Sequence, residues 1–218
     1  GRVLELDVNV KATSVKFQLA EEGAPVQVET NNEYIDVWQN GDKLTVSEKG
    51  HGCFGWGSRG DLIVHLRKDV VLDDVKLEMG AGALNIDELA TKRLRLNLGA
   101  GKTWVGRLRV LDSADIDGGA GVIELQSSEI KDLNLKLGVG KADLHAKLTG
   151  NNRIETGVGK ADLSLEGKIN DYKIIVDKGI GGVTIDGSDV GDGSVTGDGR
   201  TLVDISAGVG PVEIRTTE

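Results

Sequence analysis

The chain has very few cysteines, prolines and aromatic residues. Its 218 residues include one Cys and two Pro, and Phe, Trp and Tyr together make up only 3%. A single cysteine excludes an internal disulfide, and so few aromatics leave the interior to be filled by Val, Ile, Leu and Ala. No segment approaches the roughly 18 consecutive apolar residues of a transmembrane helix. We therefore expect no direct membrane insertion by this segment.

Positive charge is also in short supply. Lys and Arg number 26 against 35 Asp and Glu, which gives a net charge of −9. Nucleic-acid affinity comes mainly from basic side chains that neutralise phosphates, so nucleic acid is excluded as a partner, and an anionic membrane surface is disfavoured. No signal peptide is visible. Because the chain starts inside a strand-like pattern, we expect its targeting or anchoring segment to lie outside these residues.

Glycine, by contrast, is abundant, with 32 residues, and most of its pattern is one repeat. A Gly-x-Gly motif with an aliphatic middle residue recurs seven times, and its first glycines are separated by 19, 20, 19, 19, 22 and 29 residues. The middle residue is always Ala, Val or Ile. The glycine pairs are Gly80 and Gly82, Gly99 and Gly101, Gly119 and Gly121, Gly138 and Gly140, Gly157 and Gly159, Gly179 and Gly181, and Gly208 and Gly210.

Alternating apolar residues surround each glycine pair. Val75, Leu77 and Met79 precede the first pair, and Leu84 and Ile86 follow it. This period of two predicts strands with one buried face. We expect the middle residue to keep the inward register, and the second glycine to form a corner that absorbs a one-residue slip. Each copy is thus predicted to be a strand, a glycine corner, a second strand and a return turn.

The predicted fold is all-β: a single-domain β-solenoid over residues 1–218, with stacked rungs of about 19–20 residues, since repeats of this length bury a core only by stacking. Residues 71–218 form the regular Gly-x-Gly array. Residues 1–70 lack the glycine pair but remain strand-like, with a hairpin signal at Asn40-Gly41-Asp42. We interpret them as irregular N-terminal rungs that cap the stack.

The array resembles the toastrack-like family of bacterial cell-envelope proteins, whose members are often labelled adhesins. The rungs from Val75 to Ile214 carry the resemblance, above all YKIIVDKGIGGVTI at residues 172–185 and AGVGPVEI at residues 207–214. The resemblance implies a β-solenoid, an extracellular or cell-envelope location and links to adhesion or envelope stress. It supplies no catalytic motif and no cofactor.

One outward column could carry catalysis. Glu124, Asp143 and Asp162 each lie five residues after the first glycine of a pair, so neighbouring carboxylates would be about 5 Å apart, as in retaining glycosidases. Lys141 and Lys160 form a parallel column that can neutralise them, and a solvated ladder of paired charges is the favoured interpretation.

The segment from Asp186 through Asp189 to Asp192 is rich in Asp, Gly and Ser, whose oxygens suit Ca²⁺. It lacks a closing glutamate, and turn chemistry explains the same residues without an ion. These three aspartates are weak calcium candidates.

A second irregular loop concentrates Phe54 and Trp56 between glycines, followed by Arg59 and Asp61 in an Arg-Gly-Asp tripeptide. These four residues are candidate contacts for a partner, although the aromatics could instead cover the end of the stack. His51, Cys53 and His65 are too scattered to predict zinc.

No nucleophile and histidine have a recognisable catalytic spacing, so the sequence predicts that the chain is not an enzyme. We expect a surface-exposed interaction domain whose partners are envelope proteins or glycans. Two alternatives stay open: a polysaccharide-active β-helix enzyme that uses the Glu124, Asp143 and Asp162 stripe, and a domain of a membrane-anchored envelope-stress sensor.

Overall fold

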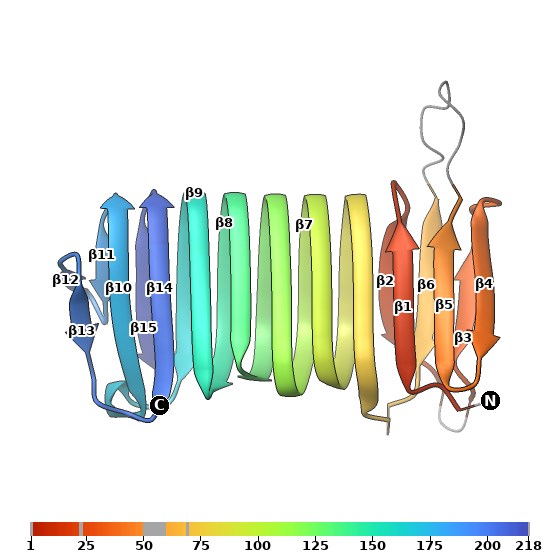
Figure 1. The fold of residues 1–218 in the computed structure, drawn as a ribbon, viewed down its shortest axis with the longest axis horizontal. Helices are drawn as coiled ribbons and strands as arrows, with labels where there is room; N and C mark the ends of the chain where they lie inside the picture. Colours follow the sequence, from red (N-terminus) through yellow and green to blue (C-terminus); the bar gives the residue numbers. More distant parts are fainter. Residues whose placement is uncertain (1, 22–23, 50–59, 69, 218) are drawn as a thin grey trace.

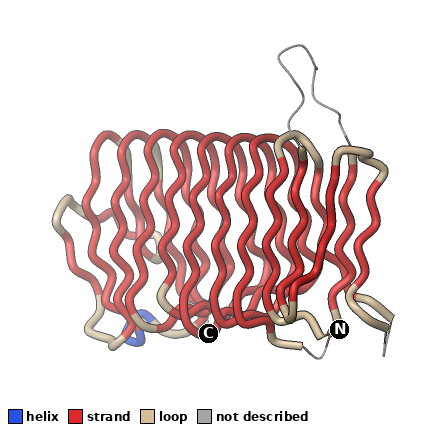
Figure 2. Tube along the Cα trace, turned by 45° about the vertical axis from the view of Figure 1, so that its right-hand side comes forward, coloured by secondary structure: helices blue, strands red, loops and turns tan. Residues whose placement is uncertain are grey.

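Extended backbone dominates the protein because its apolar residues alternate with polar ones almost throughout. The computed structural model describes residues 2–21, 24–49, 60–68 and 70–217. In Figure 2 the strands form regular coils, and the blue segment is a short 3₁₀ turn, η1 (Ile169–Asp171). None of the described residues belongs to a helix long and apolar enough to cross a bilayer.

The strands fall into a terminal group at each end and three long strands between them. The N-terminal strands are β1 (Glu5–Val10), β2 (Ser14–Leu19), β3 (Gln27–Thr30), β4 (Ile35–Asn40), β5 (Lys43–Glu48) and β6 (Asp61–Leu66). The long strands are β7 (Leu72–Lys131), β8 (Leu133–Thr149) and β9 (Asn151–Glu166). The C-terminal strands are β10 (Tyr172–Ile180), β11 (Val183–Ile185), β12 (Ser188–Val190), β13 (Ser194–Thr196), β14 (Thr201–Val209) and β15 (Val212–Thr217).

Neighbouring rungs pair in parallel and in register, which confirms the β-solenoid. Leu77 pairs with Val8, and Leu135 pairs with both Ile116 and Ile154. Leu77, Leu96, Leu135 and Ile154 are all at most 2% exposed. One core cluster of buried residues extends from Val3 to Ile214. The aliphatic side chains therefore share one interior along the stack of rungs, whose backbone is drawn in Figure 1.

The glycine pairs stand at the corners between the first and second strands of each rung. The second glycine of all seven pairs has a φ between 133° and 151°, a region open to glycine alone at little cost. Successive pairs also stack backbone on backbone: a Cβ at Gly159 would overlap the carbonyl oxygen of Gly140. Both constraints explain why the pair recurs at rung spacing.

The prediction that the middle residue of each pair points inward is wrong. Val139, Val158 and Val209 are 55%, 51% and 47% exposed, and Ile180 is 76% exposed. The corner turns the backbone already at the first glycine, so the middle side chain points away from the interior. The slip is complete by the fourth residue after the first glycine, where the predicted inward positions are buried. The middle residues thus form an exposed aliphatic ridge along one edge of the solenoid.

At the N-terminal end the rungs do not stack in chain order. The rung formed by β1 and β2 lies directly against β7, and β5 and β6 pair outside it. The predicted hairpin joins β4 to β5, and β4 and β3 add antiparallel strands beyond β5 and β6. The described residues before β7 therefore form one rung continuous with the array and one capped outer rung.

The C-terminal end has the same arrangement in reverse. The last strands, β14 and β15, lie against β9, while the earlier β10 and β11 pair outside them. The antiparallel β13 and β12 cover β10 and β11. The long intervals of 22 and 29 residues in the glycine spacing provide the chain needed to pass outward and then return.

Candidate functional site

The outward side chains of the strands that precede the glycine corners form one polar surface, which we call the front face. In β1, β5 and the first rung of β7, the residues Asp7, Thr45 and Lys76 are direct neighbours in register on it. Successive side chains of a strand point to opposite faces of the sheet. Each strand therefore places only its outward, polar side chains on this face. The front face therefore consists of columns of charged, amide and hydroxyl side chains.

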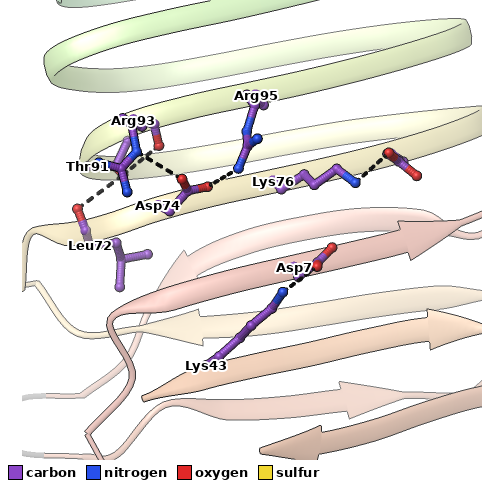
Figure 3. Close-up of polar contacts among 9 residues, drawn as sticks. Asp7, Lys43, Leu72, Asp74, Lys76, Thr91, Arg93 and Arg95 are labelled. Carbon is purple, nitrogen blue, oxygen red and sulfur yellow. Dashed lines mark hydrogen bonds and ion pairs between the residues drawn. The ribbon is translucent and has the colours of Figure 1, made fainter. Parts of the chain in front are cut away.

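Ion pairs order the N-terminal half of the front face (Figure 3). The Asp74 carboxylate lies 2.9 Å from an Arg95 guanidinium nitrogen and 3.0 Å from Arg93 Nε. Burial alone would raise the pKa of Asp74, but the two guanidinium groups hold that pKa below its ordinary value. Lys43 pairs with Asp7 at 2.8 Å on the neighbouring strands. These contacts fix the positions of the long cationic side chains.

Beside these ion pairs lies a shallow groove of about 320 Å³ on β7 and β8. Its polar lining mixes both signs of charge with amides: Lys76, Glu78, Arg95, Asn97, Asp115, Asp117, Asn134 and Lys136. Lys76 pairs with Glu78 at 2.7 Å, and the Asn134 amide donates to Asp115 at 3.1 Å. Part of the lining is thus already satisfied within the protein.

Three lining residues are not satisfied in this way. Asn97, Asp117 and Lys136 each lie two residues before the first glycine of successive pairs, and Asp117 and Lys136 are direct neighbours in register. Within the described ranges, none of the three side chains has a hydrogen bond or an ion pair. We call these three residues the free front row. They offer an amide, a carboxylate and an ammonium group to a ligand.

The strands that follow the corners carry the predicted carboxylate stripe on the opposite side, the back face. Glu124 neighbours Asp143, and Asp143 neighbours Asp162, as the spacing predicted. Each carboxylate has a lysine partner. Lys102 lies 3.0 Å from Glu124, Lys141 lies 2.9 Å from Asp143, and Lys160 lies 2.8 Å from Asp162.

The ion pairs of the stripe also act on a lysine. Hydrogen bonding and charge attraction from Asp143, with a further contribution from Asp162, raise the pKa of Lys141. A catalytic acid is a carboxyl that carries a proton near neutral pH, whereas each carboxylate of the stripe lies in an ion pair with a lysine. The geometry is that of a paired charge ladder.

Most of the predicted contact loop lies outside the described residues: Phe54, Trp56 and Arg59, with His51 and Cys53. Asp61 is exposed at the start of β6, where its backbone N–H donates to the Asn31 side chain at 2.7 Å. His65 lies in β6 with Gln18 and Glu29 as neighbours, at 3.1 and 3.3 Å. Of the four predicted contact residues, the structure therefore describes Asp61 alone, which lies at the start of β6.

The three calcium candidates have separate roles. The Asp186 carboxylate accepts hydrogen bonds from the Thr216 backbone N–H at 2.7 Å and the Thr216 hydroxyl at 2.9 Å. Asp192 accepts from the Lys178 backbone N–H at 3.0 Å, and Asp189 lies in β12. Among the residues that the structure describes, no three His, Cys, Asp or Glu side chains gather as a metal site would require.

Sequence reasoning did not single out the free front row. The signal was present, because aligning the rungs on their first glycines places Asn97, Asp117 and Lys136 in one column. What the alignment does not show is which polar side chains pair with one another. That distinction depends on side-chain geometry.

Comparison with known proteins gives a family match and remote structural likenesses. The family model Toastrack DUF4097 matches residues 3–179 and, in a second match, residues 58–216. A solved structure of a candidate cell adhesion protein from Clostridium sporogenes has 20% identity and a TM-score of 0.43, covering 99% of this chain and 94% of that one. A candidate adhesin from Bacteroides fragilis has 13% identity and a TM-score of 0.37, covering 100% and 93%. No curated protein matches the chain.

Proposed function

Since the chain belongs to the Toastrack family, we propose that it is a non-catalytic interaction domain of the cell envelope or cell surface. Its front face would bind a polar partner, either an envelope protein or a glycan. The cell-envelope setting follows from the family resemblance. The choice of the front face rests on the residues described above.

The free front row carries this proposal. Exposed polar side chains that already pair within the protein gain little from a ligand, because a new contact only replaces an old one. Asn97, Asp117 and Lys136 have no such contact to lose, and they line a groove that neighbouring ion pairs hold in shape. Donors and acceptors in one straight row fit an extended ligand with alternating polar groups.

The alternative of polysaccharide cleavage is less well supported. The three carboxylates of the back-face stripe are adjacent, but each one is ion-paired with a lysine at 2.8 to 3.0 Å. The other alternative, a domain of a membrane-anchored stress sensor, is compatible with the same interaction face, because a sensor also needs a surface that meets its partner.

The test is a binding screen of the purified protein against envelope glycans and envelope proteins. The informative variant combines Asn97→Ala, Asp117→Ala and Lys136→Ala. A matched control on the back face combines Gln126→Ala, His145→Ala and Ser164→Ala, each of which lies seven residues after the first glycine of a pair. We expect the front-face variant to lose binding at least tenfold, about 1.4 kcal/mol, while the control binds like the wild type. Equal losses in both variants would refute the assignment of the face.

A further inference from the structure

The strand β4 ends the sheet at the N-terminal end of the solenoid, and nothing in the described part of the chain pairs with its outer edge. In Figure 1 it is the outermost strand at the right. A sheet edge presents unpaired N–H and C=O groups to any strand that can reach them. At six residues, β4 is long enough to serve as a template for pairing.

The hairpin register shows which backbone groups are free. Asn40 pairs with Lys43 across a two-residue turn, so these residues form a hydrogen-bonded pair. The Lys49 N–H donates to the Tyr34 carbonyl at 2.9 Å, which fits the same alternation. The even-numbered residues of β4 therefore face β5. The N–H and C=O groups of Val37 and Gln39 point outward, away from the sheet.

The side chains of β4 lack the features that usually protect an edge. Trp38 and Val37 are 50% and 44% exposed, and the strand contains no Lys, Pro or bulge. Its single charge, on Asp36, is paired with Lys49 at 2.7 Å. Both the amino-acid composition of β4 and its unpaired outer edge therefore favour pairing with another strand.

The opposite end of the solenoid differs. There the antiparallel cap strands β12 and β13 have three residues each. Gly191, Asp192 and Gly193 separate them, so the outer edge is short and interrupted. Short edge strands beside charged turns are poor templates for pairing. The two ends are thus unequal: among the described residues, the β4 end alone offers an edge strand of six residues with exposed Val and Trp side chains.

We propose that β4 pairs antiparallel with the β4 strand of a second copy of this chain, joining two solenoids end to end around a two-fold axis. With the axis at Trp38, Val37 faces the second copy's Gln39, and all four of these residues point their free backbone groups at each other. The pairing forms four hydrogen bonds. The two Trp38 side chains meet as a cross-strand aromatic pair, which stabilises sheets.

Charge agrees with this register. In the same alignment Asp36 faces the second copy's Asn40, so no two like charges are opposed. A second copy fits the edge without any change in sequence, because the strand is complementary to itself when it is reversed about Trp38. The partner of this edge is therefore another molecule of the same protein, distinct from the polar ligand of the front face.

Sedimentation velocity of the 218-residue chain tests the proposal, between about 10 µM and 1 mM, the range in which weak dimers form. We expect the wild type to approach twice the mass of one chain. Trp38→Lys and Gln39→Pro should stay monomeric, the first by adding edge charge and the second by removing an outward N–H. Val195→Lys, on the exposed strand β13 at the other end, should dimerise like the wild type. Circular dichroism and thermal melts confirm that each variant is folded.

A cysteine variant tests the register independently of affinity. Residues that face each other in a non-hydrogen-bonded antiparallel pair have Cα atoms about 4.5 Å apart, within reach of a disulfide. In a Cys53→Ser background, Trp38→Cys should form a covalent dimer under mild oxidation, and Val37→Cys should form at least fivefold less. A monomeric wild type at the highest concentration, or equal cross-linking at both positions, would overturn the proposal.

Discussion

The Glu48 carboxylate accepts a hydrogen bond from the backbone N–H of Lys11, 2.6 Å away, and a second from that of Ala12 at 3.1 Å. Lys11 and Ala12 lie between β1 and β2, where the first glycine and the middle residue of a Gly-x-Gly motif stand in the regular rungs. The Asn32 amide completes the contact by donating to Glu48 at 3.3 Å. At this corner a buried acidic side chain accepts hydrogen bonds from the backbone N–H groups. At the other corners the stacked glycine pairs of neighbouring rungs fulfil this role.

This contact predicts a pH-dependent contribution to stability. Burial would raise the pKa of Glu48, but the N–H groups of Lys11 and Ala12 hold that pKa below its ordinary value. A lowered folded-state pKa stabilises the fold above the unfolded-state pKa, near 4, and the effect is lost as pH falls through the folded value. Glu48→Gln should cost about 1–3 kcal/mol at pH 7. Urea unfolding at pH 7 and pH 3 checks this, and the difference from wild type should shrink at pH 3. Glu5→Gln, at an exposed position, is the control.

The corner glycines should be far less tolerant than other glycines. Gly159→Ala places a Cβ against the Gly140 carbonyl at a φ of 147°, so we expect a loss of at least about 2 kcal/mol or failure to fold. Gly182→Ala is the matched control, because nothing lies within 4 Å of a Cβ there. Thermal denaturation of both variants measures the difference, and we expect a lower melting temperature for Gly159→Ala. Similar melting temperatures would contradict the stacking argument.

The rung register predicts opposite outcomes for two aliphatic residues four positions apart. Ile154 is fully buried and Val158 is 51% exposed. Ile154→Ala should cost about 2–5 kcal/mol through loss of packing, and Val158→Ala should stay within about 0.5 kcal/mol. Chemical denaturation measures both. A larger effect at Val158 would mean that the middle residue of the glycine pair is buried after all.

Asp74 should contribute modestly to stability and more to the shape of the groove. Its partners Arg93 and Arg95 are half exposed, so solvent screens the ion pairs and Asp74→Asn should cost only about 1 kcal/mol. The variant should also weaken any front-face ligand, because Arg95 loses its anchor. Melting curves and the binding screen test the two effects separately. Asp112→Asn, at an exposed position away from the groove, should change neither.

Calcium should have no effect on folding. Asp186 and Asp192 already accept backbone hydrogen bonds, from Thr216 and Lys178, and their carboxylates are not gathered around one point. Melting temperatures in millimolar Ca²⁺ and in a chelator should therefore agree. A rise of several degrees with Ca²⁺ would show that the segment rearranges into a site.

The sequence by itself determined the rung. Glycine pairs at 19- to 22-residue spacing and strict alternation around them identify a β-solenoid, because only stacked rungs bury such short apolar strands. The buried residues of each rung, such as Leu135 and Ile154, are also predicted by the alternation alone. So does the neutralised stripe, since Asp143 and Lys141 occupy fixed positions relative to the same glycine.

Tertiary structure decided the rest. The order of the rungs at both ends, with β1 inside β5 and β14 inside β10, depends on which surfaces are left to be covered, and a local pattern does not record that. The outward direction of Val158 depends on where within the corner the backbone turns. The free front row depends on which charged side chains reach one another. Each of these is a relation between rungs, and periodicity describes only the single rung.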